Sequence, residues 1–86
     1  MKIEYSKDAL KFLMKTQKSY VLTIRQAIAG LTKTPPEGDI KPMRGYSDGR
    51  QRLRVGKYRV IYRYSGEGEA ATLHIIDIGS RGDIDK

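Results

Sequence analysis

The chain contains no cysteine among its 86 residues. Disulfide bonds, a thiolate metal site and a thiol nucleophile are therefore excluded, and packing alone has to stabilise the fold. The absence of disulfides fits the reducing cytoplasm, which is the location we expect. A chain of this length buries only about 60–65% of its unfolded surface, so it forms one domain, residues 1–86, with a small core.

Long apolar runs are also missing from the sequence. No stretch approaches the roughly 20 apolar residues that a membrane-spanning helix needs. The first ten residues, MKIEYSKDAL, lack the continuous apolar segment of a signal peptide. The sequence thus predicts a soluble, unprocessed protein with no membrane partner.

Side chains that usually perform catalysis or bind metals are scarce. His74 is the only histidine, and its place inside an expected strand is typical of a structural or half-exposed residue. The carboxylates of Asp77, Asp83 and Asp85 lack metal-ligand spacing, and no glycine-rich loop leads from a strand into a helix to hold a phosphate. We therefore expect no metal and no cofactor.

Basic residues, in contrast, are in excess and are concentrated in one segment. The net charge is +7, and the segment from Lys41 to Arg63 alone holds eight basic residues against Asp48. The nine basic and nine acidic residues elsewhere balance. Positive charge concentrated in one segment indicates a polyanionic partner, above all nucleic acid. The alternative is an ordinary basic surface that is exposed to solvent.

Apolar spacing predicts an α+β fold in the order β-α-α-β-β-β. Ser6 can cap a first helix that reaches about residue 17, and Ser19 can cap a second helix that ends before Pro35. A short segment interrupted by Pro42 can add an edge strand. The four strands of this order are residues 2–5, 50–55, 57–64 and 71–78, and the segment that can add an edge strand is residues 40–43. Both helices should pack on one face of a small, mostly antiparallel sheet.

A hairpin turn at Gly56 and Lys57 would fix which side chains share a face of the sheet. Glycine in the first position suits a type II′ turn, which places Val55 opposite Tyr58. One face is then apolar and tyrosine-rich. The other face is basic and pairs Arg54 with Arg59, Arg52 with Ile61, and Arg50 with Arg63.

Like charges opposite each other destabilise a sheet by a few tenths to about 1 kcal/mol per pair, and a bound phosphate chain would offset that loss. Tyr58, Tyr62 and Tyr64 fall on the packed face, so Tyr46 in the loop is the better candidate for stacking on a base. The residues expected to contact RNA are Lys41, Arg44, Tyr46, Arg54 and Lys57. Ordinary surface charge is the plain interpretation of Arg54 and Arg63.

Two motifs give the sequence a resemblance to a known family. They are R-x-R-x-G-x-Y-R-V-I-Y at residues 52–62 and I-G-x-R at residues 78–81. With the β-α-α start and the proline-rich crossing, they make nearly the whole chain similar to the RelE/ParE superfamily of bacterial toxins. The resemblance implies a RelE-like fold and a cognate antitoxin that wraps the toxin and covers or distorts its basic face.

The superfamily has two branches. RelE-like toxins cleave messenger RNA in the ribosomal decoding site, whereas ParE-like toxins poison DNA gyrase and do not need the basic cluster. The basic active-site positions of the RelE-like branch correspond to Arg50, Arg52, Arg59 and Arg81. All four are basic here, which favours a ribosome-dependent, metal-independent endoribonuclease with the ribosome and messenger RNA as partners.

The resemblance implies attack of a ribose 2′-hydroxyl on the adjacent phosphate. Arginine is a poor base, so Arg50, Arg52 and Arg59 would orient the phosphate and stabilise its charge, with Arg81 near the leaving oxygen. The family's C-terminal tyrosine falls at Asp85 or the residue before it. Three explanations stay open: activity is weak, the tail was altered to spare the producing host, or a loop tyrosine substitutes. A gyrase inhibitor and a non-catalytic nucleic-acid-binding module are the alternative functions.

Overall fold

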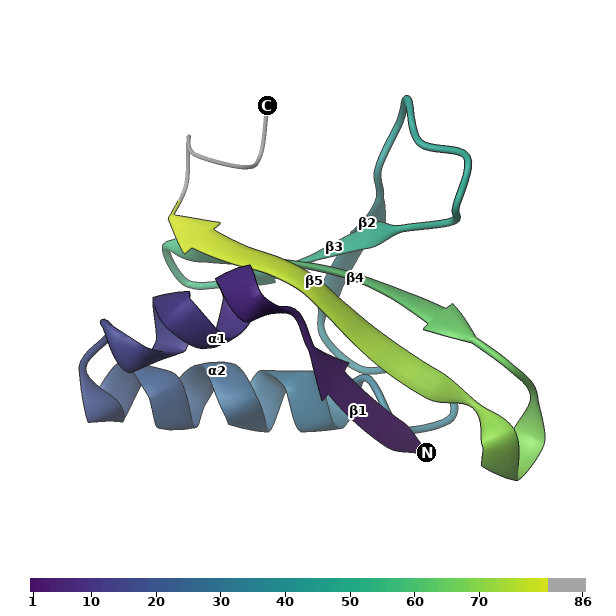
Figure 1. Cartoon of the computed structure of the whole chain (residues 1–86), viewed down its shortest axis with the longest axis horizontal. Helices are drawn as coiled ribbons and strands as arrows, with labels where there is room; N and C mark the ends of the chain where they lie inside the picture. Colours follow the sequence, from purple (N-terminus) through teal and green to yellow (C-terminus); the bar gives the residue numbers. More distant parts are fainter. Residues whose placement is uncertain (81–86) are drawn as a thin grey trace.

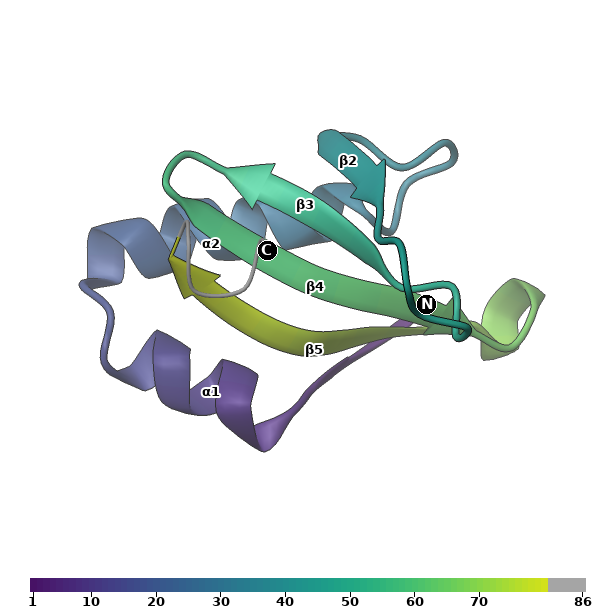
Figure 2. The same ribbon diagram turned by 90° about the horizontal axis from the view of Figure 1, so that it is seen from above.

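Two helices cover one face of a five-stranded sheet in the computed structural model, which describes residues 1–80 (Figure 1). The elements are β1 (Lys2–Tyr5), α1 (Lys7–Met14), α2 (Lys18–Gly30), β2 (Asp39–Pro42), β3 (Gln51–Val55), β4 (Tyr58–Ser65), a short 3₁₀ helix (Gly68–Ala70) and β5 (Thr72–Ser80). The strand order is β1-β5-β4-β3-β2, with β1 and β5 parallel and the other pairs antiparallel. The predicted α+β fold is confirmed. Seen from above, α2 lies beneath the sheet and α1 lies beside it next to β5, so neither described helix lies over the other side, the open face (Figure 2).

The two helices begin differently from each other. Ser6 caps α1 as predicted, because its Oγ accepts a hydrogen bond from the backbone N–H of Ala9 at 3.0 Å. The predicted Ser19 cap of α2 is wrong. Gln17 has the extended backbone that precedes the first turn, with φ −57° and ψ 143°, so Ser19 already lies inside the helix.

The β3–β4 hairpin has the predicted register. Gly56 has a φ of +58° while Lys57 does not adopt a positive φ, which is the pattern of a type II′ turn. Val55 lies opposite Tyr58, and Arg54 opposite Arg59. The ladder ends at the pair formed by Gln51 and Tyr62, so the predicted Arg50–Arg63 pair is not part of it. Arg50 precedes the strand, and Arg63 lies opposite His74 of β5 instead.

A β-bulge between β4 and β5 lies near the middle of the sheet. Ile61 is opposite Asp77, but the next residue, Tyr62, is opposite Ile75. The extra residue in β5 allows Ile75 and Ile78, three positions apart, to face the same side of the sheet. Simple alternation along β5 did not reveal this shift.

The core lies between the helices and the sheet. Its buried residues are Ala9, Leu13, Ile24, Ile28, Leu31, Leu53, Tyr58, Val60, Tyr62, Leu73, Ile75 and Ile78. The Tyr64 hydroxyl donates to the carbonyl oxygen of Leu31 at 2.7 Å, which ties β4 to the end of α2. Burial raises the pKa of Tyr62 and, to a smaller degree, that of Tyr64. The assignment of these strand tyrosines to the packed face is therefore confirmed.

Neither described helix has the length and apolar character needed to cross a bilayer.

Candidate nucleic-acid interface

The strand register arranges the side chains of the open face in rows across the sheet. One row contains Asp39, Arg54 and Arg59. The next contains Lys41, Arg52, Ile61 and Asp77. A third contains Arg63, His74 and Glu4. Three arginines that sequence alternation assigned to one face, Arg52, Arg54 and Arg59, therefore lie on neighbouring positions of β3 and β4.

Asp39 of the edge strand β2 lies among these arginines. Its Oδ2 is 2.6 Å from Nη2 of Arg54, and its Oδ1 is 3.9 Å from Nη2 of Arg52. The repulsion between the arginines is thus relieved partly within the chain. Asp39 was not among the predicted site residues, because it precedes both the basic segment and the expected edge strand. Its place opposite Arg54 becomes visible only when β2 is paired with β3.

Arg59 is buried, although it lies on the basic face as predicted and that face was expected to be open to a phosphate chain. Only 4% of the residue is accessible. Its Nη1 donates to the carbonyl oxygens of Gly56 and Tyr58, each at 3.1 Å, so the side chain folds back onto the turn that precedes it. The side chain of Arg52 is also largely covered at 11% exposure, whereas that of Arg54 is 53% exposed. Facing away from the helices therefore does not make a side chain accessible.

Arg50 lies with the loop that precedes β3 and not with the strand arginines. Its Nη2 is 2.8 Å from Oδ2 of Asp48. This hydrogen bond raises the pKa of Arg50 and lowers that of Asp48. The guanidinium carbon is also 4.1 Å from the centre of the Tyr46 ring, a cation–π contact.

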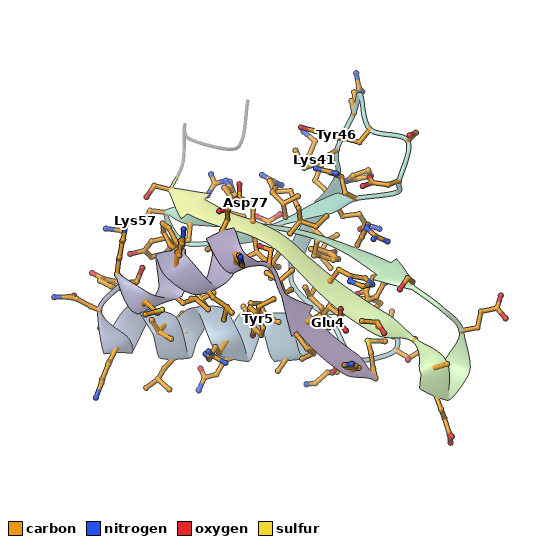
Figure 3. The ribbon with its side chains drawn as sticks, viewed as in Figure 1. Glu4, Tyr5, Lys41, Tyr46, Lys57 and Asp77 are labelled. Carbon is orange, nitrogen blue, oxygen red and sulfur yellow. The ribbon has the colours of Figure 1, made fainter. Side chains whose placement is uncertain are left out.

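Tyr46, proposed to stack on a base, is half exposed. Figure 3 shows it in the loop that rises beside the open face. Lys41 is exposed on β2 opposite Arg52, and Arg44 is exposed in the turn that follows β2. The structure therefore gathers Tyr46, Arg50 and Asp48 into a unit beside the rows of the sheet.

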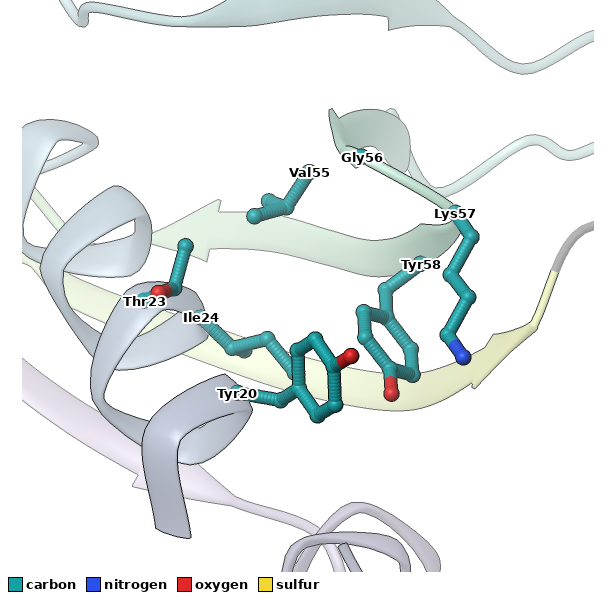
Figure 4. A pocket seen from close by; sticks show the side chains of 7 residues that line it. All are labelled: Tyr20, Thr23, Ile24, Val55, Gly56, Lys57 and Tyr58. Carbon is teal, nitrogen blue, oxygen red and sulfur yellow. The ribbon is translucent and has the colours of Figure 1, made fainter. Parts of the chain in front are cut away.

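Lys57 lies elsewhere. Its Nζ is 5.2 Å from the centre of the Tyr20 ring and 5.4 Å from that of Tyr58. These three residues line a pocket of about 420 Å³ between α2 and the β3–β4 turn (Figure 4). Lys57 thus extends toward the helices, apart from the open-face arginines. Arg81 and Asp85, the other two predicted site positions, lie outside the described residues.

His74 is held by two neighbours. Its Nε2 is 2.6 Å from Oγ of Ser65, and its Nδ1 is 3.6 Å from Oε2 of Glu4. Both ring nitrogens therefore face protein groups, as in a structural histidine. Within residues 1–80, no group of three His, Cys, Asp or Glu side chains is arranged to hold a metal ion.

The chemistry available on the open face is that of fixed positive charge. Arginine remains protonated in proteins and can donate two parallel hydrogen bonds to a phosphate. Preorganised donors of this kind stabilise negative charge as it develops on a reacting group. The arrangement is therefore suited to binding a phosphate chain and to stabilising added charge on one phosphate.

Comparisons with known proteins identify the family. The family model described as "ParE toxin of type II toxin-antitoxin system" matches residues 3–84. No match was found among curated proteins.

Solved structures share the fold. A YoeB/ParE toxin from Agrobacterium tumefaciens is 26% identical, with 93% of this chain and 98% of that chain covered and a TM-score of 0.79. A chain of the archaeal RelE–RelB complex from Pyrococcus horikoshii is 26% identical, with 95% of this chain and 96% of that chain covered and a TM-score of 0.70. A chain of the intact E. coli RelBE toxin–antitoxin complex shares the fold at 19% identity, with 92% and 94% covered and a TM-score of 0.66. The chain therefore belongs to the ParE toxin family of type II toxin–antitoxin systems, within the RelE/ParE superfamily.

Proposed function

We propose that this toxin is a ribosome-dependent endoribonuclease that cleaves messenger RNA and so inhibits translation. The observation that supports this most is the convergence of Arg52, Arg54 and Arg59 from two adjoining strands on the open face. A gyrase inhibitor of the ParE type does not need this cluster. The two solved structures that share 26% identity, a YoeB/ParE toxin and a RelE toxin, agree with either branch of the superfamily.

In the proposed reaction the ribose 2′-oxygen attacks the adjacent phosphorus and the 5′-oxygen of the next nucleotide leaves. The products are a 2′,3′-cyclic phosphate, which water can hydrolyse to a 3′-phosphate, and a 5′-hydroxyl, whose oxygen takes up a proton from solvent to replace the one that the 2′-hydroxyl releases. Arg52 and Arg59 stabilise the negative charge that develops on the phosphate oxygens. The two carbonyls that accept from Arg59 fix one edge of its guanidinium before substrate binds, so less reorganisation is needed during the reaction.

Arg50 and Tyr46 have a second role in this proposal. Tyr46 offers a half-exposed ring, and Arg50 already stacks on it at 4.1 Å. The pair would support a messenger base while Lys41, Arg44 and Arg54 hold the backbone. Arg81 near the leaving oxygen, and Asp85 in place of the family's tyrosine, keep the roles implied by the superfamily resemblance. Lys57 is the weakest of the proposed RNA contacts because it lies toward the helices.

The direct test is incubation of the purified chain with translating ribosomes, followed by mapping of the 5′ ends of the message. We expect defined cuts, and Arg52→Gln should reduce the rate by about 100-fold or more, the usual effect of losing one preorganised donor. Lys18→Gln is the matched control, since it removes one charge from the start of α2, on the helix side of the sheet. Asp85→Tyr should increase cleavage. Uncut message at every toxin concentration, with Asp85→Tyr included, would count against the proposal.

Gyrase inhibition is the second candidate, because the matching family model is that of ParE toxins. In that case supercoiling by purified gyrase would be inhibited while the message stays intact, and Arg52→Gln would keep the inhibition. A plain binding module would show neither effect. It would bind single-stranded RNA with a log–log salt slope of about −0.7 per neutralised phosphate and would show no turnover.

We also propose a cognate antitoxin as the physiological partner and the cytoplasm as the location. Several similar solved structures are complexes of toxin with antitoxin, among them the RelE–RelB complex of Pyrococcus horikoshii and the RelBE complex of E. coli. A small acidic protein encoded beside this chain should bind it tightly and suppress cleavage. Co-expression and co-purification of the two chains test this directly.

A further inference from the structure

Arg63 differs from the other arginines on the open face. Arg54 and Arg52 lie near Asp39, and Arg59 donates to main-chain carbonyls. Arg63 points to the same side of the sheet, opposite His74. Within the part of the chain that the structure describes, its guanidinium takes part in no ion pair and no side-chain hydrogen bond. An external anion at Arg63 would therefore not have to displace an internal carboxylate.

A pocket of about 240 Å³ adjoins this arginine. Its lining includes Arg63, His74, Tyr5 and Glu4, which come from three different strands. Figure 3 shows Glu4 and Tyr5 on β1, away from the β3–β4 turn where Lys57 lies. The space is large enough for more than one water molecule and is open to a ligand group.

The one carboxylate of this pocket is already paired. Oε1 of Glu4 lies 3.2 Å from Nζ of Lys2, and Oε2 lies 3.6 Å from the imidazole of His74. Because a neighbouring cation offsets its charge, Glu4 opposes an incoming anion only weakly. His74 is fixed by Ser65 and Glu4, so it forms a rigid wall of the pocket and leaves Arg63 as the anion-binding group.

Arg63 is also correctly placed for a second contact with a chain already bound at the arginine cluster. It is four residues from Arg59 on the same strand and the same face. At about 3.3 Å per residue, the two positions are roughly 13 Å apart along β4. That separation is too large for one phosphate to bridge, but it suits two phosphates of one extended strand.

We propose that Arg63 and the adjoining pocket bind a backbone phosphate of the RNA strand, outside the bond that is cleaved. This inference rests on the proposed function, because it assigns to the same open face a longer stretch of the same substrate. The strand would run along β4 from the arginine cluster toward the end where β1 meets β5. Arg63 is a binding residue in this account and takes no part in the bond rearrangement.

The test is binding of non-cleavable 2′-deoxy oligonucleotides, measured by fluorescence anisotropy at several salt concentrations. The probes are a dinucleotide and a strand of about ten nucleotides, a typical length for one single-strand-binding site. Arg63→Gln should weaken binding of the longer strand about fivefold and reduce its salt slope by about 0.7, the value for one phosphate. Binding of the dinucleotide should not change, and Arg63→Lys should restore most of the loss.

Lys18→Gln again serves as the control for one lost charge, and melting temperatures of all variants show that they are folded. Equal binding by Arg63→Gln and Lys18→Gln would overturn the inference. The inference would also be overturned if inorganic phosphate bound in an Arg63-dependent way and the longer strand failed to displace it, because the pocket would then bind a free anion.

The two proposals fail in different ways. If the message is cut on ribosomes but Arg63→Gln binds RNA as well as the control does, the proposed subsite at Arg63 is wrong and the proposed ribonuclease activity stands. If the longer strand binds in an Arg63-dependent way but the message is never cut, the proposed ribonuclease activity is wrong and the open face is an RNA-binding surface.

Discussion

The two faces of the same sheet bury their side chains by different means. On the helix side Leu53, Val60 and Tyr62 are buried among other apolar groups. On the open face Arg59 is nearly as buried, but its Nη1 donates to two main-chain carbonyls. Nearby, Arg52 and Arg54 share Asp39. The comparison teaches that the position of a charge along a strand and its availability to a ligand are separate properties.

The largest expected effect is a difference in unfolding free energy between substitutions at two neighbouring residues of β3. Leu53 is fully buried and Arg54 is 53% exposed on the opposite face. Leu53→Ala should lower the free energy of unfolding by about 2–5 kcal/mol, because it removes packed apolar contacts and leaves a cavity. Arg54→Ala should change it by less than about 1 kcal/mol, since its ion pair with Asp39 is exposed. Urea unfolding of both variants checks the contrast, and equal losses would contradict it.

Arg59→Ala should be destabilising as well as inactive. The substitution leaves the carbonyls of Gly56 and Tyr58 without their donor, which should cost about 1–3 kcal/mol of unfolding free energy. Arg59→Lys keeps the charge but loses the planar fork, so it should recover only part of the stability. A variant with unchanged stability would show that the buried guanidinium adds nothing to the fold.

Asp39→Asn should make Arg54 more available to RNA without changing the place of Arg54 on the strand. The change removes the carboxylate that lies 2.6 Å from Arg54 while it keeps the size of the side chain. Affinity for single-stranded RNA should rise about two- to fivefold, within the range of an exposed ion pair. Asp8→Asn is the matched control, since it removes an exposed carboxylate from the first turn of α1, on the helix side of the sheet. A fall in affinity for Asp39→Asn would mean that Asp39 orients Arg54 instead of competing with RNA.

The smallest expected effect is a change in the pKa of Asp48, in the loop that precedes β3. The hydrogen bond from Arg50 lowers the pKa of Asp48 below its ordinary value of 3.8. Because the folded pKa is depressed, the contribution of this pair to stability is present above pH 3.8 and is lost as the pH falls through the lowered value. Arg50→Gln should return the pKa toward 3.8 in an NMR titration of the carboxyl group. An unchanged pKa would show that Arg50 does not hold Asp48 in solution.

Sequence alternation was sufficient to predict the register of the hairpin and the side on which Arg52, Arg54 and Arg59 lie, but not the place of Arg50 in the loop before β3. Both follow from one turn, because a period of two leaves no freedom once Val55 and Tyr58 are paired. The cap at Ser6 was predictable for a similar reason, since the capping serine immediately precedes the helical pattern.

The burial of the arginines depended on contacts that no local pattern contains. Asp39 reaches Arg54 only through the pairing of β2 with β3. The fold-back of Arg59 is local, since its two acceptors lie one and three residues earlier, but a period of two gives only the side of the sheet and not the course of a long side chain. The β-bulge shifts the register between β4 and β5 after Ile61. Single-sequence periodicity does not encode any of these features.

The most direct test of the account is the mapping of message 5′ ends on translating ribosomes with the chain and its Arg52→Gln variant at matched concentrations. We expect defined cuts with the unaltered chain, and a rate about 100-fold lower with the same amount of folded Arg52→Gln chain. Intact message at concentrations of the folded chain that inhibit gyrase supercoiling would contradict it.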